Sequence, residues 1–252
     1  MINQYVWWAC ILLEALLLSR SIPRLFVRFP IFYSYLGCVL FMDTARWSIY
    51  KVYPSFYGPF YWCTEFLIAI VGYGVILEIY NQALARDPGV SRFIRIVLVS
   101  VLFVIIAKAS ADFWGSSAHS FASSAATLER DLRTVQAVML VALLGIFMAY
   151  QIPIGRNLRG IILGYSLFVG FSVIDLTIFV KHESPYSLLM RKLQPISYLI
   201  CLAIWASALW SLAPEPECEA AGDIEKDYEL IVLQTKAKVL RARAYLVRTV
   251  RP

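Results

Sequence analysis

Residues 59–82 read PFYWCTEFLIAIVGYGVILEIYNQ. A bilayer core about 30 Å thick needs roughly 20 apolar residues in helical form, so this stretch is long enough to cross a membrane. Six further stretches are also apolar and of similar length. A Gly/Ser/Ala-rich loop at 115–127 separates two of them. The predicted spans are 4–20, 31–50, 59–82, 93–113, 133–151, 159–180 and 194–213. The sequence therefore predicts an all-α, polytopic membrane protein with seven transmembrane helices.

The composition indicates the same class. Apolar residues make up 60% of the chain and charged residues 16%, whereas a soluble domain is about half apolar and a quarter charged. The seven spans and their loops occupy residues 1–213, and residues 214–252 form a tail. Since no Lys or Arg precedes the first apolar run, we expect a span there rather than a cleaved signal peptide.

Lysine and arginine residues set the expected orientation. Fifteen of those in loops and tail fall on the side of the odd-numbered loops and the C-terminus, and seven fall on the other side. Cytoplasmic loops carry the positive excess, so the N-terminus is predicted outside and the C-terminus inside, in a bacterial cytoplasmic (inner) membrane. The net charge of +6 comes from these loops and the tail, so it does not indicate a nucleic-acid partner.

Ionisable side chains in the predicted spans carry the functional signal, because such groups are costly in lipid unless they are paired or hydrated. Glu14 and Glu78 are expected in the inner half of the membrane, paired with loop arginines. The other candidates are expected at one depth in the outer half, around a polar cavity for a small polar or amphipathic ligand. These predicted ligand-binding residues are Asp43, Arg46, Glu65, Lys108, Asp112, Gln136, Asp175 and Tyr198.

Helical spacing predicts two ion pairs in this group. Asp43 and Arg46 are three residues apart, and Lys108 and Asp112 are four apart, so each pair can meet on one helix face. Glu65 has no local partner and is expected to pair across helices or to be protonated. The alternative is that all these charges form closed interhelical pairs, which fix the packing and bind no ligand.

The predicted helices lack the residues that several classes of activity require. His119 and His182 both fall in predicted loops, so a haem- or zinc-dependent enzyme has no ligands on the helices. The five cysteines show no metal-binding spacing. No proline falls in the middle of a predicted span, which disfavours the broken helices of many transporters. We expect no cofactor, no metal site and no enzymatic activity.

The tail has two halves of opposite charge. Residues 215–229 are acidic, and residues 236–251 are basic. Between 223 and 250 apolar residues recur every three or four positions, which is typical of an amphipathic helix. Such a cytoplasmic helix can lie on the anionic inner leaflet or dock a cytoplasmic or membrane protein partner.

Two segments resemble a known family. The first contains Tyr61-Trp62, Glu65, Gly72, Glu78-Ile79, Pro88-Gly89, Arg92 and Arg95, and the second contains Leu128-Glu129-Arg130, Arg133 and Gln136. Together they resemble an uncharacterised family of seven-helix membrane proteins abundant in soil acidobacteria, over about residues 55–180. The family has no assigned activity. The resemblance therefore implies the topology, and it favours Glu65, Glu78, Arg130 and Gln136 as functional positions.

These features favour a receptor-like or sensory membrane module that binds a small ligand in the outer half and signals through its tail to a partner protein. A small-molecule or proton-coupled transporter is one alternative, with Glu65 or Asp175 as the titrating carboxylate. A non-catalytic subunit of a larger membrane complex is another, and it predicts buried charges that are fully paired.

Overall fold

The computed structural model of the chain describes residues 2–20, 23–85, 88–115, 121–150, 154–181, 186–211, 226, 228–236 and 238. Within these ranges the chain is helical and contains no strand, which confirms the predicted all-α class. Its long helices are α1 (Ile2–Ser19), α3 (Pro30–Val52), α4 (Tyr57–Ala83), α5 (Pro88–Gly115), α6 (Phe121–Tyr150), α7 (Arg156–Lys181) and α8 (Tyr186–Leu209). Two short helices, α2 (Pro23–Arg28) and the 3-10 helix η1 (Pro54–Phe56), lie between long ones.

Apolar length places the chain among helical membrane proteins. Four described segments are long and apolar enough to cross a bilayer: Pro54–Ala83, Gly89–Lys108, Thr127–Ala149 and Arg156–Ile178. Tyr5–Ser19 and Leu193–Leu209 are shorter apolar helices. α3, which carries Asp43 and Arg46 among several tyrosines and serines, is in neither group. The seven long helices nevertheless coincide in position with the seven predicted spans.

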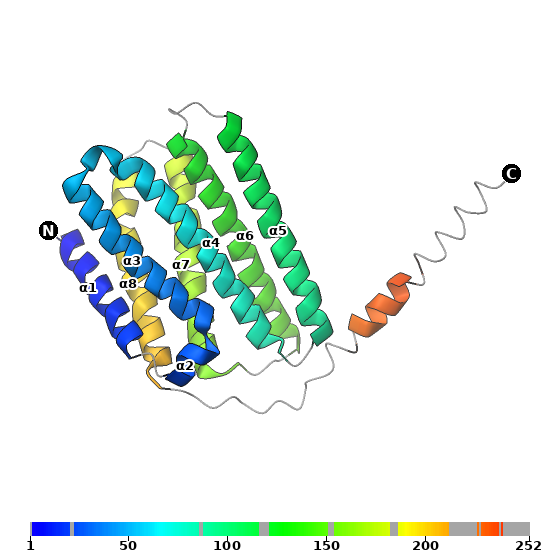
Figure 1. Cartoon of the computed structure of the whole chain (residues 1–252). Coiled ribbons are helices and arrows are strands. Elements are labelled where there is room, and N and C mark those ends of the chain that lie inside the picture. Colours follow the sequence, from blue (N-terminus) through cyan, green and yellow to red (C-terminus); the bar gives the residue numbers. More distant parts are fainter. Residues whose placement is uncertain are drawn as a thin grey trace.

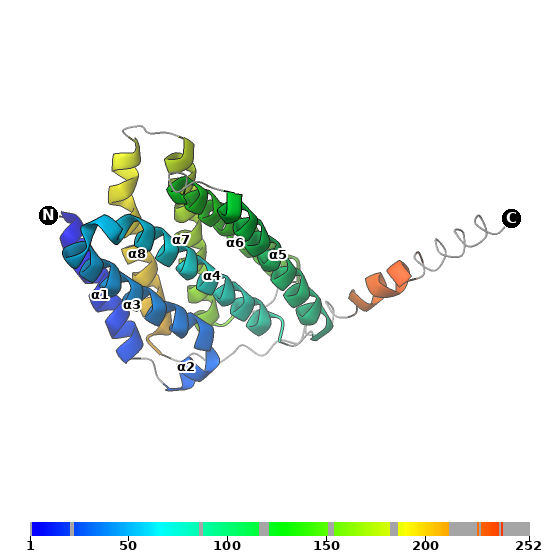
Figure 2. The same ribbon diagram turned by 45° about the horizontal axis from the view of Figure 1, so that its top comes forward.

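Six of the long helices form a closed ring. In the order α1, α3, α4, α6, α7 and α8, each packs against the next, and α8 packs against α1. Successive long helices run in opposite directions, so α1 begins and α8 ends at opposite ends of the bundle (Figure 1). Figure 2 shows the same arrangement from a tilted view, with α1 beside α8 and α5 at the far edge.

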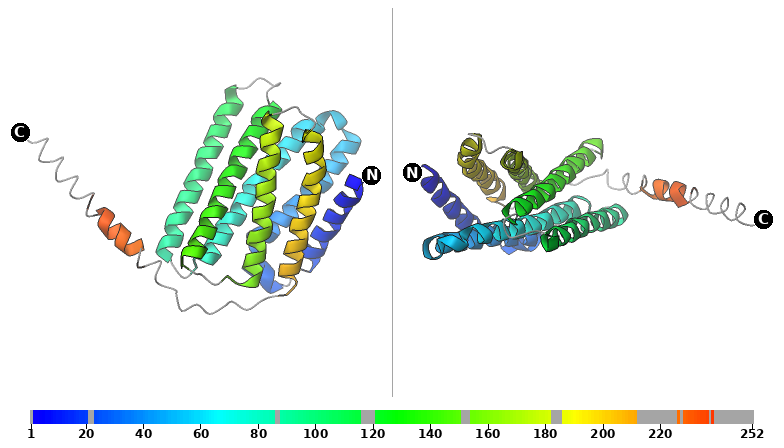
Figure 3. Two further views of the ribbon diagram at one scale, coloured as in Figure 1. Left: turned by 180° about the vertical axis from the view of Figure 1, so that it is seen from behind. Right: turned by 90° about the horizontal axis from the view of Figure 1, so that it is seen from above.

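The helix α5 lies outside this ring. It packs against α4 and α6. Only 6% of its most apolar stretch, which lies within Gly89–Lys108, is buried inside the protein. Seen from above, α3 and α4 lie on one side of the ring and α7 and α8 on the other (Figure 3). The outward side chains of α5, such as Phe93 and Phe103, are exposed in the chain itself and would face lipid in a bilayer.

Large side chains from facing helices fill the middle of the ring. Tyr35 of α3 and Tyr165 of α7 are fully buried, and their rings meet edge to face with centroids 5.8 Å apart. Trp205 of α8 is also fully buried, and it sits where a Cβ on Gly164 of α7 would collide with it. The glycine therefore lets α7 and α8 approach closely.

Two helices begin earlier than predicted. α6 starts at Phe121 rather than at residue 133, so most of the predicted Gly/Ser/Ala loop is helical. α8 starts at Tyr186 rather than at residue 194, so Pro195 lies inside a helix. Pro195 lies near the start of the apolar segment Leu193–Leu209, so the expectation that no proline falls in the middle of a span is not contradicted. Both errors have one cause, because the end of an apolar run was taken for the end of a helix, and polar residues can extend helices beyond it.

One part of the predicted tail helix is described. Residues 226, 228–236 and 238 are helical, and Leu230, Ile231 and Leu233 are exposed there. The ring of Tyr228 lies 6.2 Å from the ring of Phe93, near the start of α5. The rest of the predicted amphipathic helix lies outside the described residues.

Candidate functional site

Arg46 of α3 is the first centre of a buried ion network. Its Nη1 atom lies 2.7 Å from Glu65 Oε1 and 3.4 Å from Asp43 Oδ1. Its Nε atom donates to Thr64 Oγ1 over 2.6 Å, and its guanidinium lies 4.9 Å from the centre of the Tyr61 ring. The predicted Asp43–Arg46 pair is therefore confirmed, and Glu65 has the interhelical partner that was expected.

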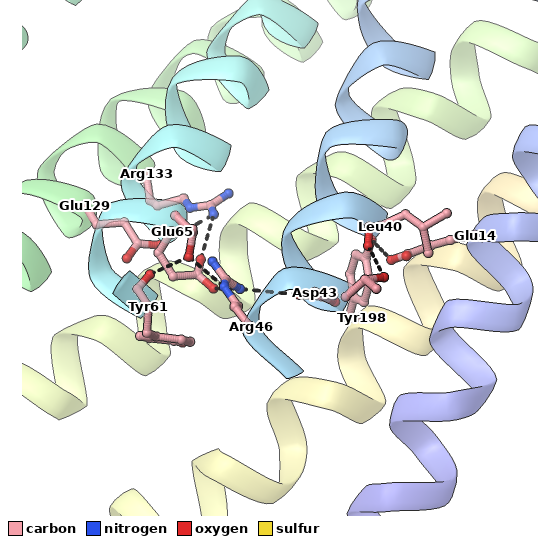
Figure 4. Close-up of polar contacts among 11 residues, drawn as sticks. Glu14, Leu40, Asp43, Arg46, Tyr61, Glu65, Glu129, Arg133 and Tyr198 are labelled. Atoms are coloured by element: carbon pink, nitrogen blue, oxygen red, sulfur yellow. Dashed lines mark hydrogen bonds and ion pairs between the residues drawn. The ribbon is translucent and has the colours of Figure 1, made fainter. Parts of the chain in front are cut away.

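Arg133 of α6 is the second centre. Its side chain is 1% exposed, and its Nη2 atom lies 3.5 Å from Glu129 Oε1 and 3.9 Å from Glu65 Oε2. The guanidinium packs 4.8 Å from the centre of the Phe168 ring of α7. Glu65 therefore stands between the two arginines, and the network joins α3, α4 and α6 (Figure 4).

Sequence reasoning missed Arg133 and Glu129 as site residues. The predicted span began at residue 133, so Arg133 was counted among the charges of the outer side, whereas α6 begins at Phe121. A signal was present, since Glu129 and Arg133 are four residues apart and Gln136 follows three later. That spacing places all three on one helix face.

A layer of neutral polar groups lies next to Arg133. Gln136 is fully buried, and its Nε2 atom donates to the carbonyl oxygen of Ala69 in α4 over 2.8 Å. The Tyr165 hydroxyl occupies the space that a Cβ on Gly72 of α4 would need. Gln136, a predicted site residue, therefore lies within the same interior region.

Tyr198 of α8, also a predicted site residue, bonds to a residue that was expected elsewhere. Its hydroxyl donates to Glu14 Oε1 of α1 over 2.6 Å, and Glu14 is fully buried. Both groups interact electrostatically with Asp43. Figure 4 shows Glu14 and Tyr198 on the Asp43 side of the ion network. The predictions that Glu14 lies deeper than Tyr198 and pairs with a loop arginine were wrong, because position along a tilted helix gives depth only roughly.

Three predicted site residues stand apart from the network. Lys108 of α5 lies outside the ring, where its exposed side chain pairs with Asp131 of α6 over 2.8 Å. The side chain of Asp112 is outside the described residues, and so is the predicted Lys108–Asp112 pair. Asp175 of α7 is partly buried, and it lies near enough to Glu65 for the two carboxylates to repel each other.

Glu78, which the family resemblance favours as a functional residue, holds the start of α3 in place. Its Oε1 and Oε2 atoms accept hydrogen bonds from the backbone N–H groups of Ile31 (2.9 Å) and Phe32 (2.8 Å). These are the first free N–H groups of α3, which starts at Pro30 and has no side-chain cap of its own. Both carboxylate oxygens are thus used by backbone groups, where a loop arginine was expected.

Several buried atoms of the site have no hydrogen-bond partner within the described structure. They are Arg46 Nη2, Arg133 Nε and Nη1, the Tyr35 and Tyr165 hydroxyls, Gln136 Oε1 and Glu14 Oε2. Buried polar atoms in native proteins are nearly always satisfied. Each of these unpaired atoms therefore carries an energetic cost within the fold, of roughly 1–3 kcal/mol.

The donor set does not fit a metal centre. Among the residues that the structure describes, no three His, Cys, Asp or Glu side chains lie together in a way that could hold a metal ion. The arginines at the network would also repel a cation.

Comparison with known proteins adds no identification. No family model matches the chain, and no curated protein and no solved structure matches it either. The resemblance to the acidobacterial seven-helix family therefore rests on the quoted residues alone.

Proposed function

We propose that the protein is a receptor-like or sensory module of the bacterial cytoplasmic membrane, with seven crossings, an outer N-terminus and a cytoplasmic tail. It binds a small ligand within the helix ring and signals through the tail to a partner protein. The observation that carries the proposal is the ion network of Asp43, Arg46, Glu65, Glu129 and Arg133, which joins three helices of the ring and in which both arginines and Glu129 are buried.

Stability alone does not account for such a network. Desolvation of buried charges offsets most of their attraction, so buried ion pairs contribute little net stability compared with apolar packing. Removing or adding one charge in such a cluster, however, changes the energy strongly. A ligand that redistributes hydrogen bonds here would therefore shift α3, α4 and α6 relative to one another, which is the response that a receptor needs.

The tail is placed to report such a shift. It follows α8, whose Tyr198 bonds to Glu14 inside the ring. Its described part also contacts the start of α5 through Tyr228 and Phe93.

Limited trypsin digestion of the full-length protein in lipid nanodiscs tests the coupling. Trypsin cleaves after the lysines and arginines of residues 236–248, so the rate at which the tail is lost reports how accessible the tail is. We expect Glu65→Gln to change this rate by about twofold or more, because the loss of the central charge shifts the ring between its conformations.

Asp131→Asn is the matched control. It makes the same chemical change in the Lys108–Asp131 pair outside the ring, and we expect it to leave the rate unchanged. Equal rates for wild type, Glu65→Gln and Asp131→Asn would remove the basis for signalling through the tail.

A proton-coupled carrier is the second candidate, and one observation favours it. Pro195 lies inside α8, three residues before Tyr198, and an internal proline gives transporters a point at which a helix can bend. Glu14, rather than Glu65, is then the titrating carboxylate, because Glu65 is engaged by both arginines, whereas Glu14 Oε2 has no hydrogen-bond partner among the described residues.

Proteoliposomes that contain a pH-sensitive dye separate the two candidates. A carrier gives proton entry under an imposed pH gradient, and Glu14→Gln abolishes it. If the protein is a receptor, neither the wild type nor Glu14→Gln gives proton entry.

A further inference from the structure

We infer that the exposed side of α5 binds an anionic phospholipid, with Arg92 and Arg95 at the headgroup and an apolar strip of the helix along an acyl chain. This inference goes beyond the proposed function and does not depend on it. It concerns the outer surface of the bundle and not the interior of the ring.

The apolar strip runs along the side of α5 that faces away from the ring. Gly89–Lys108 is the most apolar of the four segments that are long enough to cross a bilayer, and it is also the least buried. Ile96, Val99 and Phe103 are all exposed. With Arg92 they are spaced four, three and four residues apart, so they lie on one helix face. The strip therefore leads from Arg92 toward the middle of α5.

The length of the strip matches one leaflet of a membrane. An α-helix rises 1.5 Å for each residue, so the backbone rises about 16 Å from Arg92 to Phe103. Half of a bilayer core about 30 Å thick is roughly 15 Å. A lipid whose acyl chain lies along the strip therefore has its headgroup beside Arg92.

Arg92 and Arg95 supply positive charge at the level of the headgroup. Both are exposed, and they are three residues apart on the same helix, so both guanidinium groups can approach one phosphate. Arg95 Nη2 donates to Asn81 Oδ1 of α4 over 3.1 Å. This neutral acceptor orients the guanidinium without cancelling its charge. Like charges one helix turn apart repel each other, and a bound anion offsets that repulsion.

Other arginines at this end of the bundle also contact neutral groups. The Arg20 guanidinium lies 3.7 Å from the centre of the Trp210 ring, and Arg156 Nη2 donates to the Ser211 carbonyl oxygen over 3.2 Å. At the opposite end, by contrast, Lys108 and Arg130 both pair with Asp131 (Figure 1). Among the described residues, the end where α5 begins therefore has the positive excess that attracts anionic headgroups.

The strip and the arginines together point to a lipid rather than to a soluble anion. A free phosphate ester would use the arginines and leave the apolar strip uncovered. A lipid without net charge would cover the strip and gain little from the arginines. An anionic phospholipid uses both parts of the surface.

Native mass spectrometry of the full-length protein in a non-ionic detergent tests the inference by counting bound molecules. Three compounds are added separately: phosphatidylglycerol, phosphatidylcholine and glycerol 3-phosphate, which has a phosphate and no acyl chain. We expect a lower apparent Kd for phosphatidylglycerol than for phosphatidylcholine. We expect no binding of glycerol 3-phosphate.

Arg92→Gln tests the charge. The attraction of one basic residue to an anionic lipid surface corresponds to about fivefold in affinity, so we expect the apparent Kd for phosphatidylglycerol to rise by about that factor. The Kd for phosphatidylcholine should stay the same. Lys51→Gln is the matched control, because Lys51 is an exposed cation beside Trp47 near the end of α3, at the opposite end of the bundle. It should leave both values unchanged.

Phe103→Ala tests the apolar strip. It shortens the surface available to an acyl chain, so we expect weaker binding of both lipids. Phe41→Ala is the matched control, because Phe41 of α3 is 67% exposed and Phe103 is 72% exposed. Since all four substituted side chains are exposed, each variant should fold like the wild type.

Four results would overturn the inference. Equal Kd values for the two lipids in the wild type would show that charge does not contribute. Equal losses in Arg92→Gln and Lys51→Gln would show attraction to the net charge of the protein rather than to this surface. Equal losses in Phe103→Ala and Phe41→Ala would show general coating by lipid. Glycerol 3-phosphate that binds as tightly as phosphatidylglycerol would show a surface for free phosphate.

Discussion

Glu65 is the side chain on which both arginines of the ring converge. Arg46 approaches Oε1 and Arg133 approaches Oε2, so neither guanidinium can lose this partner without consequence for the other. A buried charge that keeps no partner costs far more than the intact pair contributes. Substitution of one member is therefore expected to be much more damaging than its share of the contacts implies.

Arg46→Met tests this asymmetry. It leaves Asp43 and Glu65 without their shared cation, and we expect the free energy of unfolding to fall by about 3–5 kcal/mol. Lys108→Met removes an exposed pair with Asp131 and should cost less than about 1 kcal/mol. Denaturant-induced unfolding in matched lipid gives both values, and similar losses in the two variants would show that the network is not desolvated.

Gly72→Ala tests the close approach of α4 and α7. The added methyl group would overlap the Tyr165 hydroxyl, and overpacking of this kind costs typically about 1–3 kcal/mol. In the Tyr165→Phe background the overlapping oxygen is gone, so we expect most of the loss to disappear. A double-mutant cycle measures this, and additive effects would show that the two residues do not touch.

Residue pairs were predictable where the partners share a helix face. Asp43 and Arg46 follow from their spacing alone. The partners of Glu14 and Glu78 did not follow, because a side chain can be satisfied by a hydroxyl or a backbone N–H as well as by an arginine. Arg133 was missed because its depth depends on where α6 begins, which its polar neighbours conceal.

At the scale of the helices, the start of α3 depends on a residue of α4. The first turn of a helix has free N–H groups, and a negative charge there is favourable for both hydrogen bonding and the helix dipole. Glu78 supplies that charge to Ile31 and Phe32. α3 and α4 are therefore joined at this end by Glu78 and further along by the pair between Arg46 and Glu65.

Glu78→Ala is expected to loosen the first turn of α3. Two N–H groups lose their acceptor, and we expect a loss of about 1–3 kcal/mol in the free energy of unfolding. Hydrogen–deuterium exchange should accelerate at Ile31 and Phe32 and stay unchanged at the middle of α3. Glu78→Gln retains one acceptor oxygen and should show a smaller effect, whereas unchanged exchange in both variants would contradict the capping role.

Helix positions were more predictable than helix ends. A long apolar run identifies the central part of a helix, so each predicted span falls on a long helix. The polar turns of α6 before residue 133 and of α8 before residue 194 carry no such mark. The position of Pro195 well inside α8 was not predicted for the same reason.

At the scale of the whole molecule, successive long helices run in opposite directions. Consecutive connections between them therefore lie at opposite ends of the bundle (Figure 1). Ser55 in η1 and Ala85 beyond α4 are exposed at these opposite ends. The proposed orientation puts Ser55 outside the cell and Ala85 in the cytoplasm. Extension of α6 back to Phe121 also moves Arg133 out of the outer loop, which strengthens the positive bias of the other side.

Cysteine labelling checks the orientation. In a background that carries Cys63→Ala and Cys218→Ala, Ser55→Cys should react with a membrane-impermeant maleimide in intact cells, and Ala85→Cys should react only after the cells are opened. The four cysteines of the described helices include one exposed side chain, Cys63, which is why it is removed first. The reverse pattern would place the N-terminus in the cytoplasm.

The contact between α1 and α8 has a consequence for biosynthesis. α1 precedes the other helices of the ring in the chain, and its place in the ring is completed only by α8, through the hydrogen bond from Tyr198 to Glu14. Until α8 is made, the carboxyl group of Glu14 lacks this partner. A chain that stops after α7 therefore leaves an apolar helix with an unpaired carboxyl group, a feature by which proteolysis can distinguish an unfinished copy from a complete one.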